Sequence, residues 1–169
     1  MSISKQLYNL QEADKELQKI EGVTAAKEAR LRDGAALQES QSRLKDKVEA
    51  LGKLRGEQRD QELQGEALAQ KISALASKLY GGKVSNPREL TDLQKELEYL
   101  KSHKGQVEET LLGLMERVEE AEGEATVLET DTKRLEEERR VEEAKLRGEL
   151  ENLSVQRGLV QTQRDLLRG

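Results

Sequence analysis

The triplet Gly81-Gly82-Lys83 contains residue types that could bind a phosphate group. Phosphate-binding loops follow a strand and place glycine N–H groups and a lysine around the phosphate oxygens, with Ser or Thr directly after the lysine. Here the upstream glycine, the Ser or Thr after Lys83 and a preceding strand are all missing. We therefore interpret the triplet as part of a turn.

The titratable side chains do not combine into a catalytic pattern. His103 lies in a charged stretch, and a single histidine there is typical of a solvated side chain rather than a metal ligand. Glutamate runs such as Glu136–Glu138 are typical of exposed helix faces and ion pairs, where no pocket raises a carboxyl pKa. The chain has no cysteine, which excludes a thiolate zinc site. These features predict a protein that is not an enzyme and holds no cofactor or metal.

Two long helices must position these residues, because apolar side chains recur at alternating steps of three and four along most of the sequence. The pattern predicts a first helix over about residues 4–80 and a second over about 86–168, together forming one domain, residues 1–169. Charged residues make up 37% of the chain and Phe and Trp are absent, so the apolar residues can fill only a narrow seam between helices.

The connection between the helices is predicted over residues 81–85, and residues with capping preferences mark both of its ends. Two glycines just past a helix readily adopt the left-handed conformation that ends it. An asparagine followed by proline, with glutamate three residues after the asparagine, is typical of a helix start. The predicted turn and cap residues are Gly81, Gly82, Asn86, Pro87 and Glu89.

A connection of this length makes the two helices antiparallel neighbours. Leu79 would then face Leu90, and the numbers of facing residues would sum to about 169 along the pair. Residues 108–124 contain seven glutamates and one arginine, whereas residues 43–59 opposite them are rich in Lys and Arg. Such charged pairs at seam edges set helix orientation. We therefore predict an all-α fold, a long antiparallel two-helix coiled-coil hairpin.

The N-terminal part of the first helix departs from this regularity. Its apolar residues keep the same rhythm in a shifted register, so a stutter or kink is expected around Gly22 to Gly34. Four apolar residues fall off the predicted seam and could pack against a second hairpin: Ile20, Leu31, Leu159 and Leu166. The sequence therefore leaves both a monomer and a homodimer open.

The tip also carries a resemblance to a known family. Leu79–Leu90, LYGGKVSNPREL, resembles the signature of bacterial coiled-coil proteins with a C-terminal four-cysteine zinc ribbon, and Leu10–Leu17 is similar to the family's opening pattern. The ribbon itself is absent from this sequence. We expect the chain to be a piece cut after the hairpin, with a natural short form as the alternative. Zinc is then expected only in a ribbon that follows Gly169 in the native gene.

The resemblance implies protein partners. Members of that family are linked to the sigma-54 factor of RNA polymerase and to flagellar or type III export machinery, as adaptors or chaperone-like factors. The start of the chain lacks the apolar core of a signal peptide, and no apolar run reaches transmembrane length. We therefore expect a cytoplasmic bacterial adaptor or scaffold without membrane contact.

Nucleic acid is the alternative partner that the resemblance implies. Phosphate binding needs a concentrated basic face. The net charge is +1 for residues 1–79, +1 for residues 80–89 and −7 for residues 90–169. Direct binding by the hairpin is therefore not favoured, and nucleic-acid binding would belong mainly to the absent ribbon.

The tip is the predicted protein-binding surface. Turn and cap chemistry accounts for the glycines, the asparagine, the proline and the glutamate, but not for four other residues: Tyr80, Lys83, Val84 and Arg88. Tyrosine and arginine are enriched among the residues that dominate binding energy at interfaces. We predict that these four side chains contact a partner protein.

Overall fold

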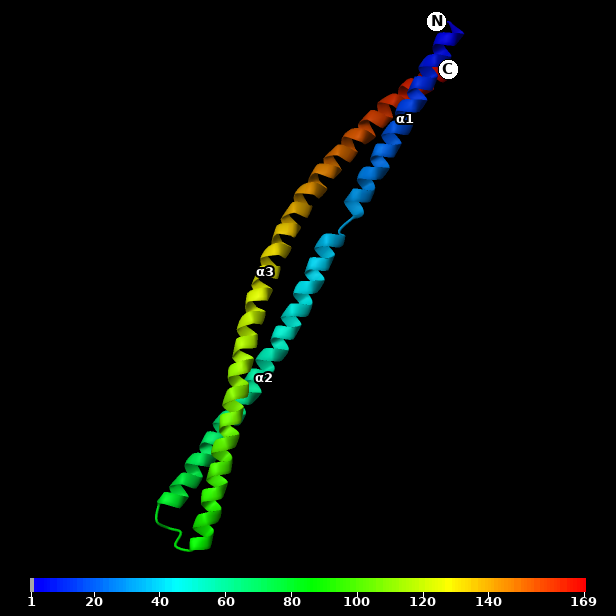
Figure 1. Ribbon diagram of the computed structural model, residues 1–169. Helices are drawn as coiled ribbons and strands as arrows, with labels where there is room; N and C mark the ends of the chain where they lie inside the picture. The colour runs from blue at the N-terminus through cyan, green and yellow to red at the C-terminus, as the bar shows by residue number, and fades with distance from the viewer. Residues whose placement is uncertain (1) are drawn as a thin grey trace. The chain divides into compact units, whose positions relative to one another are not determined.

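The structure, a computed structural model, describes residues 2–169 and contains three helices in that range. They are α1 (Ile3–Arg32), α2 (Ala35–Tyr80) and α3 (Pro87–Arg168). α1 and α2 follow one another along the first arm, and α3 forms the second arm (Figure 1). The predicted all-α antiparallel coiled-coil hairpin is confirmed.

The chain divides into two compact units. The terminal unit consists of the described part of Met1–Gln41 together with Thr130–Gly169, and the tip unit is Ser42–Glu129. In the terminal unit, α1 lies beside the last part of α3, blue beside orange and red in Figure 1. Its core cluster contains Ala13, Leu17, Ile20 and Val160, with Leu153 packed against them.

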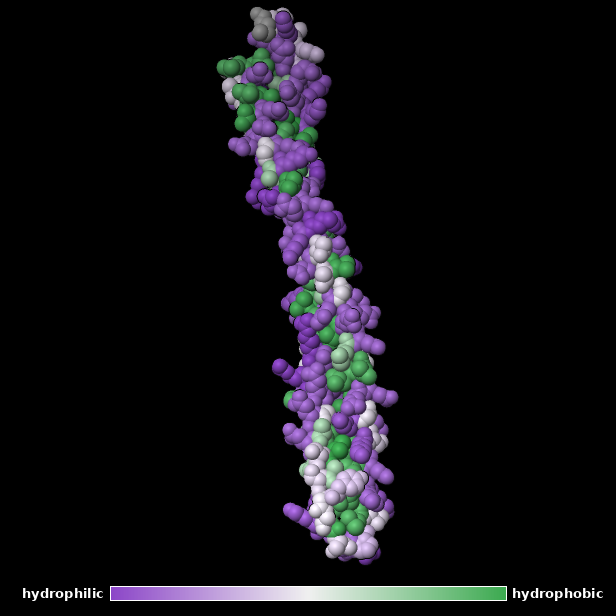
Figure 2. Space-filling model, turned by 90° about the vertical axis from the view of Figure 1, so that its left-hand side faces the viewer, coloured by the Kyte–Doolittle hydropathy of each residue, from purple (hydrophilic) through white to green (hydrophobic). Residues whose placement is uncertain are grey.

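The core of the tip unit consists of three apolar clusters. They are Leu51, Val118 and Ala121; Leu68, Leu100 and Val107; and Leu79, Leu93 and Leu97. On the face drawn in Figure 2, apolar side chains are exposed only in short stretches between hydrophilic ones. The core is thus a narrow seam, as the composition predicts.

The predicted complementarity between acidic and basic segments is also observed in the tip unit. Lys47 forms an ion pair with Glu124, and Arg55 Nη2 lies 2.7 Å from Glu122 Oε1. Each exposed pair contributes only about 0.2–1 kcal/mol. Both pairs nevertheless form only in the predicted antiparallel arrangement.

The structure corrects the prediction of one continuous helix over residues 4–80. The helix is interrupted at Asp33–Gly34, within the range where a kink is expected. Asp33 has extended backbone angles, φ −77° and ψ 102°, and its N–H donates to the carbonyls of Ala29 and Arg30 at 3.1 and 3.2 Å. Asp and Gly are both poor helix formers. α1 therefore ends at two residues that disfavour helical backbone angles.

One residue assigned outside the seam proves to be part of the core. Ile20 is buried in the core cluster of the terminal unit, and Leu31 is half-buried. Leu159 and Leu166 are exposed, as predicted. The seam of α1 includes Ile20 because the register of α1 differs from that of α2.

The tip turn has the backbone geometry that its sequence predicts. α2 ends at Tyr80, and Gly82 has a positive φ of 71°. A Cβ added at Gly81 would lie 2.6 Å from the Ser77 carbonyl oxygen, so this position admits no side chain without a shift of the backbone. The Asn86 side chain accepts a hydrogen bond from the Arg88 N–H at 3.0 Å and thereby caps α3.

Alanine substitutions at glycines are expected to change stability with opposite signs. Gly82→Ala should lower the free energy of unfolding by about 1–2 kcal/mol, because an L side chain disfavours positive φ. Gly81→Ala should also destabilise, because of the clash with Ser77. Gly56→Ala, in a helix with open space around the added methyl group, should stabilise by about 0.5–1 kcal/mol. Urea unfolding followed by circular dichroism measures all three; the same sign throughout would contradict this account.

Candidate functional site

Three of the four predicted binding residues lie exposed around the tip turn. Tyr80 is 77% exposed at the last position of α2, although a tyrosine ring offers a large apolar area. Lys83 lies in the turn and Arg88 in the first turn of α3, and both are exposed. In the described part of the chain, none of the three side chains makes a hydrogen bond or ion pair with another residue. They are therefore free to contact a partner.

Val84, the fourth predicted residue, has a different position. It is half-buried and packs against the apolar cluster of Leu79, Leu93 and Leu97. Its side chain therefore closes the end of the seam beneath the turn. Packing accounts for the valine, so the exposed candidate site consists of Tyr80, Lys83 and Arg88, which we call the tip triad.

The charge around the tip triad is mainly positive. Lys78 lies in the last turn of α2, close to the helix end where a cation is favourable. Lys83 and Arg88 add two further positive charges, and Glu89 in the first turn of α3 is the nearby carboxylate. The tip thus combines an exposed aromatic ring with an excess of cationic side chains.

The remaining polar candidates from the sequence are the carboxylates, His103 and the glycines and lysine of the tip. Within the described residues, no group of three His, Cys, Asp or Glu side chains could hold a metal ion. His103 lies on α3 beside Tyr99, with 6.2 Å between the ring centroids. The glycines and lysine of the tip triplet follow a helix rather than a strand, so they lack the setting of a phosphate-binding loop.

Ion pairs shift the pKa of two glutamates. A hydrogen bond from Lys27 lowers the pKa of Glu149 below its ordinary value, and the positive charges of Lys27, Lys145 and Arg30 lower it further. A hydrogen bond from Arg140 likewise lowers the pKa of Glu137. The Lys27–Glu149 pair joins α1 to α3 in the terminal unit, whereas Arg140–Glu137 lies within one helix.

The lowered pKa of Glu149 predicts how stability depends on pH. A carboxyl group with a lowered native pKa stabilises the fold above its unfolded pKa, about 4.3, and this contribution disappears as pH falls through the native value. Glu149→Gln is therefore expected to flatten the decrease in melting temperature below pH 4.3. Lys27→Gln should flatten it similarly, because either change removes the pair. Melting curves between pH 2 and 7 test this prediction. If the melting temperatures of both variants decreased with falling pH as steeply as that of the wild type, the prediction would be wrong.

The heptad pattern assigns three polar residues to seam positions of the terminal unit but does not indicate what they do there. Ser40 and Thr132 are buried, and their hydroxyl oxygens lie 2.6 Å apart. Arg139 of α3 donates to two carbonyls at the end of α1. The available signal was their position: all three interrupt the apolar heptad pattern at seam positions.

None of the helices described has a segment long and apolar enough to cross a membrane.

Two solved structures share the fold. One, of a protein from Mycobacterium smegmatis, is 24% identical, with a TM-score of 0.59 over 96% of this chain and 70% of that chain. The other, of the HP0958 protein from Helicobacter pylori CCUG 17874, is 19% identical, with a TM-score of 0.51 over 96% of this chain and 68% of that chain. At these identities the likeness concerns the fold alone.

No curated protein matches the sequence. The family of the CT398-like coiled coil hairpin domain matches residues 10–169, which include both arms and the tip. This match covers almost the whole chain. The chain therefore belongs to the CT398-like coiled coil hairpin domain family.

Proposed function

We propose that this protein is a non-enzymatic adaptor that binds partner proteins through the tip triad of its hairpin. The observation that carries the proposal is the exposure of Tyr80, 77%, at a turn whose backbone is fixed by Gly82 and the Asn86 cap. A rigid aromatic side chain loses little conformational entropy on binding, and tyrosine is frequent among dominant interface residues. An exposed aromatic ring at a fixed turn therefore supports a binding role for the tip.

The charge of the tip defines the partner surface that it fits. Lys83 and Arg88 flank the turn without competing carboxylate partners of their own. A complementary partner would have an apolar recess for Tyr80 surrounded by acidic side chains, because opposite potentials favour association and register. The family resemblance of the tip sequence suggests the sigma-54 factor and flagellar or type III export components as proteins to test.

A triple alanine variant tests the tip triad directly. Y80A/K83A/R88A is expected to weaken binding to the purified partner at least 30-fold, since dominant residues contribute 2 kcal/mol or more. Isothermal titration calorimetry measures the affinity of each variant for the partner, after both proteins have been treated with nuclease. The helical circular dichroism should remain unchanged, because the three side chains contribute nothing to the seam.

The chain offers a matched control for this experiment. Y99A/K101A/R117A removes the same three residue types from exposed positions of α3 outside the tip. The control should bind with wild-type affinity. Equal affinities of both variants would contradict a role for the tip triad. Binding that disappears on nuclease treatment would instead favour nucleic acid as the ligand.

A further inference from the structure

The seam of the first arm changes phase at the interruption between α1 and α2. In α1 the buried and half-buried positions recur in heptad steps up to Lys27 and Leu31. Continued by steps of three and four, this series would place the next positions at residues 34 and 38. The seam of α2 instead begins at Leu37 and continues with Ser40. The two series are therefore offset by one residue.

An offset of one residue matters because each residue turns an α-helix by about 100°. α3 keeps a single phase across the same region, with seam positions at Thr132, Leu135, Arg139, Glu142 and Leu146 in alternating steps of three and four. If the first arm were one uninterrupted helix, the α1 seam and the α2 seam could not both face α3. One of the two seams would point about 100° away from α3.

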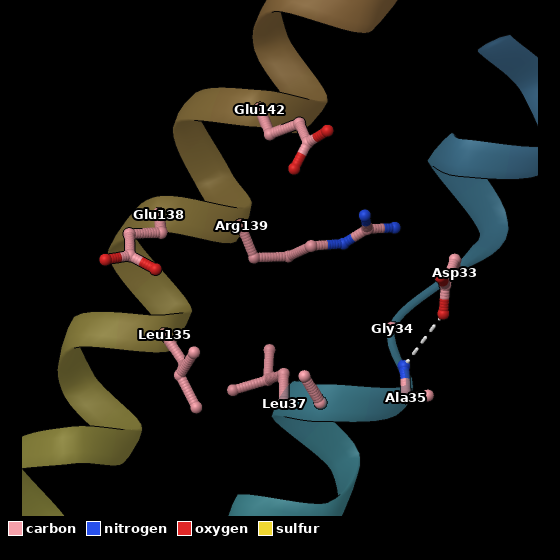
Figure 3. A pocket seen from close by; sticks show the side chains of 9 residues that line it. Asp33, Gly34, Ala35, Leu37, Leu135, Glu138, Arg139 and Glu142 are labelled. Carbon is pink, nitrogen blue, oxygen red and sulfur yellow. Dashed lines mark hydrogen bonds between the residues drawn. The ribbon is translucent and has the colours of Figure 1, made fainter.

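Hydrogen bonds of Asp33 and Gly34 cap the two helix ends created by the interruption. The Asp33 N–H closes α1, and Asp33 Oδ1 accepts from the Ala35 N–H at 3.3 Å, the dashed line in Figure 3. The Gly34 carbonyl accepts from the Gln38 N–H at 2.9 Å and begins α2. The interruption is thus a capped junction.

Arg139 supplies a second cap from the opposite helix. Its guanidinium reaches toward the junction in Figure 3 and donates to the carbonyl oxygen of Arg30 at 3.0 Å and to that of Leu31. Its side chain is only 15% exposed and is paired with Glu143 at 3.1 Å. Carbonyls in the last turn of a helix have no partner within the helix. Arg139 therefore gives the Leu31 carbonyl a donor from α3 and adds a second donor to the Arg30 carbonyl, which also accepts from Asp33.

A hollow of about 430 Å³ lies beside Arg139 at this junction. Leu37 and Leu135 lie on one side of it, and Asp33 and Glu142 on the other (Figure 3). Apolar and charged side chains therefore both line the junction, and the hydrogen bonds of Asp33 and Arg139 add to the apolar packing there.

We propose that Asp33, Gly34 and Arg139 form a phase-correcting joint. The two non-helical residues turn the first arm, so that α1 and the start of α2 both present apolar residues to α3. Arg139 of α3 donates to two carbonyls in the last turn of α1, beside the Asp33 cap, and holds α1 in the corrected orientation. The alternative conformation is a continuous helix through residues 33 and 34, with the α1 seam turned away from α3.

A pair of variants that differ by one residue tests the phase correction. D33A/G34A favours a continuous helix, in which the one-residue offset between the α1 and α2 seams is not corrected. The same variant with one alanine inserted after residue 34 restores the heptad count, because Leu37 then falls on the α1 series. The first variant is expected to lose the pairing of α1 with α3, and the second to regain it.

Spin labels report the outcome, because the chain has no cysteine and introduced cysteines are unique. Labels at Gln18 and Ser154 span α1 and α3 in the terminal unit, and labels at Lys53 and Glu116 span the tip unit. D33A/G34A should broaden the first distance distribution and leave the second unchanged; the insertion variant should narrow the first again. A narrow wild-type distribution in D33A/G34A, or no recovery on insertion, would overturn the phase correction.

Hydrogen exchange tests the cap. Arg139→Ala is expected to raise amide exchange in the last two turns of α1 about tenfold, as loss of a helix cap does. Arg140→Ala is the matched control, because the exposed Arg140 side chain pairs, among the residues that the structure describes, only with Glu137 on its own helix. Equal exchange of these amides in the two variants would overturn the role of Arg139. Faster exchange in Arg139→Ala alone supports the joint.

Discussion

Leu146→Ala is expected to lower the free energy of unfolding of the terminal unit by about 2–4 kcal/mol. Leu146 is the most deeply buried side chain among the described residues, with 1% of its surface exposed. Truncation removes apolar contacts and leaves a cavity that two paired helices fill only partly. The effect should be large because a two-helix seam has no other layer behind it to compensate.

Leu159→Ala is the matched control for this prediction. It makes the same chemical change on the same helix, but Leu159 is 65% exposed. Its effect should stay within about 0.5 kcal/mol, as for most surface substitutions. Urea unfolding by circular dichroism gives the free energies, and hydrogen exchange assigns the loss to the terminal unit. Similar effects of both variants would show that Leu146 is not a core residue in solution.

Most of the fold could be predicted because its determinants are local or periodic. Heptad spacing defines each seam, and a glycine pair before Asn86-Pro87 specifies the tip turn through backbone preferences. Once the turn is placed, the pairing register follows by counting. The observed contact of Leu51, Val118 and Ala121 and the pair Lys47–Glu124 agree with that count.

The junction between α1 and α2 could be predicted only as a region. The shifted register indicates that some adjustment must occur between Gly22 and Gly34, but a kink, a stutter and a break all accommodate it. The observed break is accompanied by hydrogen bonds from Arg139, which is more than 100 residues away in the sequence and lies beside Arg30 and Leu31 only after the arms pair. Spacing patterns contain no information about such a hydrogen bond.

The candidate site shows a similar division between local and tertiary information. Turn and cap preferences explain the glycines, the asparagine, the proline and the glutamate of the tip, and leave Tyr80, Lys83 and Arg88 unexplained. In the structure these three side chains are exposed. The role of Val84 could not be predicted this way. A valine in a turn can face a partner or the end of the seam, and only the position of the Leu79 cluster decides between them.

Removing one hydroxyl of the Ser40–Thr132 pair is expected to lower the free energy of unfolding more than removing both. Thr132 is 3% exposed and Ser40 9%, so water cannot readily replace a lost partner. Ser40→Ala or Thr132→Val alone should lower the free energy of unfolding by about 1–3 kcal/mol, because a buried hydroxyl loses its hydrogen bond. The double variant replaces both hydroxyls with apolar groups and should be close to the wild type.

A double-mutant cycle measures the coupling between the two hydroxyls. Their oxygens lie 2.6 Å apart across the helix pair. Single losses of about 1–3 kcal/mol with a near-neutral double variant correspond to a coupling of about 2 kcal/mol or more. Additive single effects would show that the bond contributes nothing. A buried polar pair also penalises every register in which its members face leucine. The double variant should therefore retain its stability but give a broader Gln18–Ser154 label distance, because the apolar seam alone discriminates less between neighbouring registers.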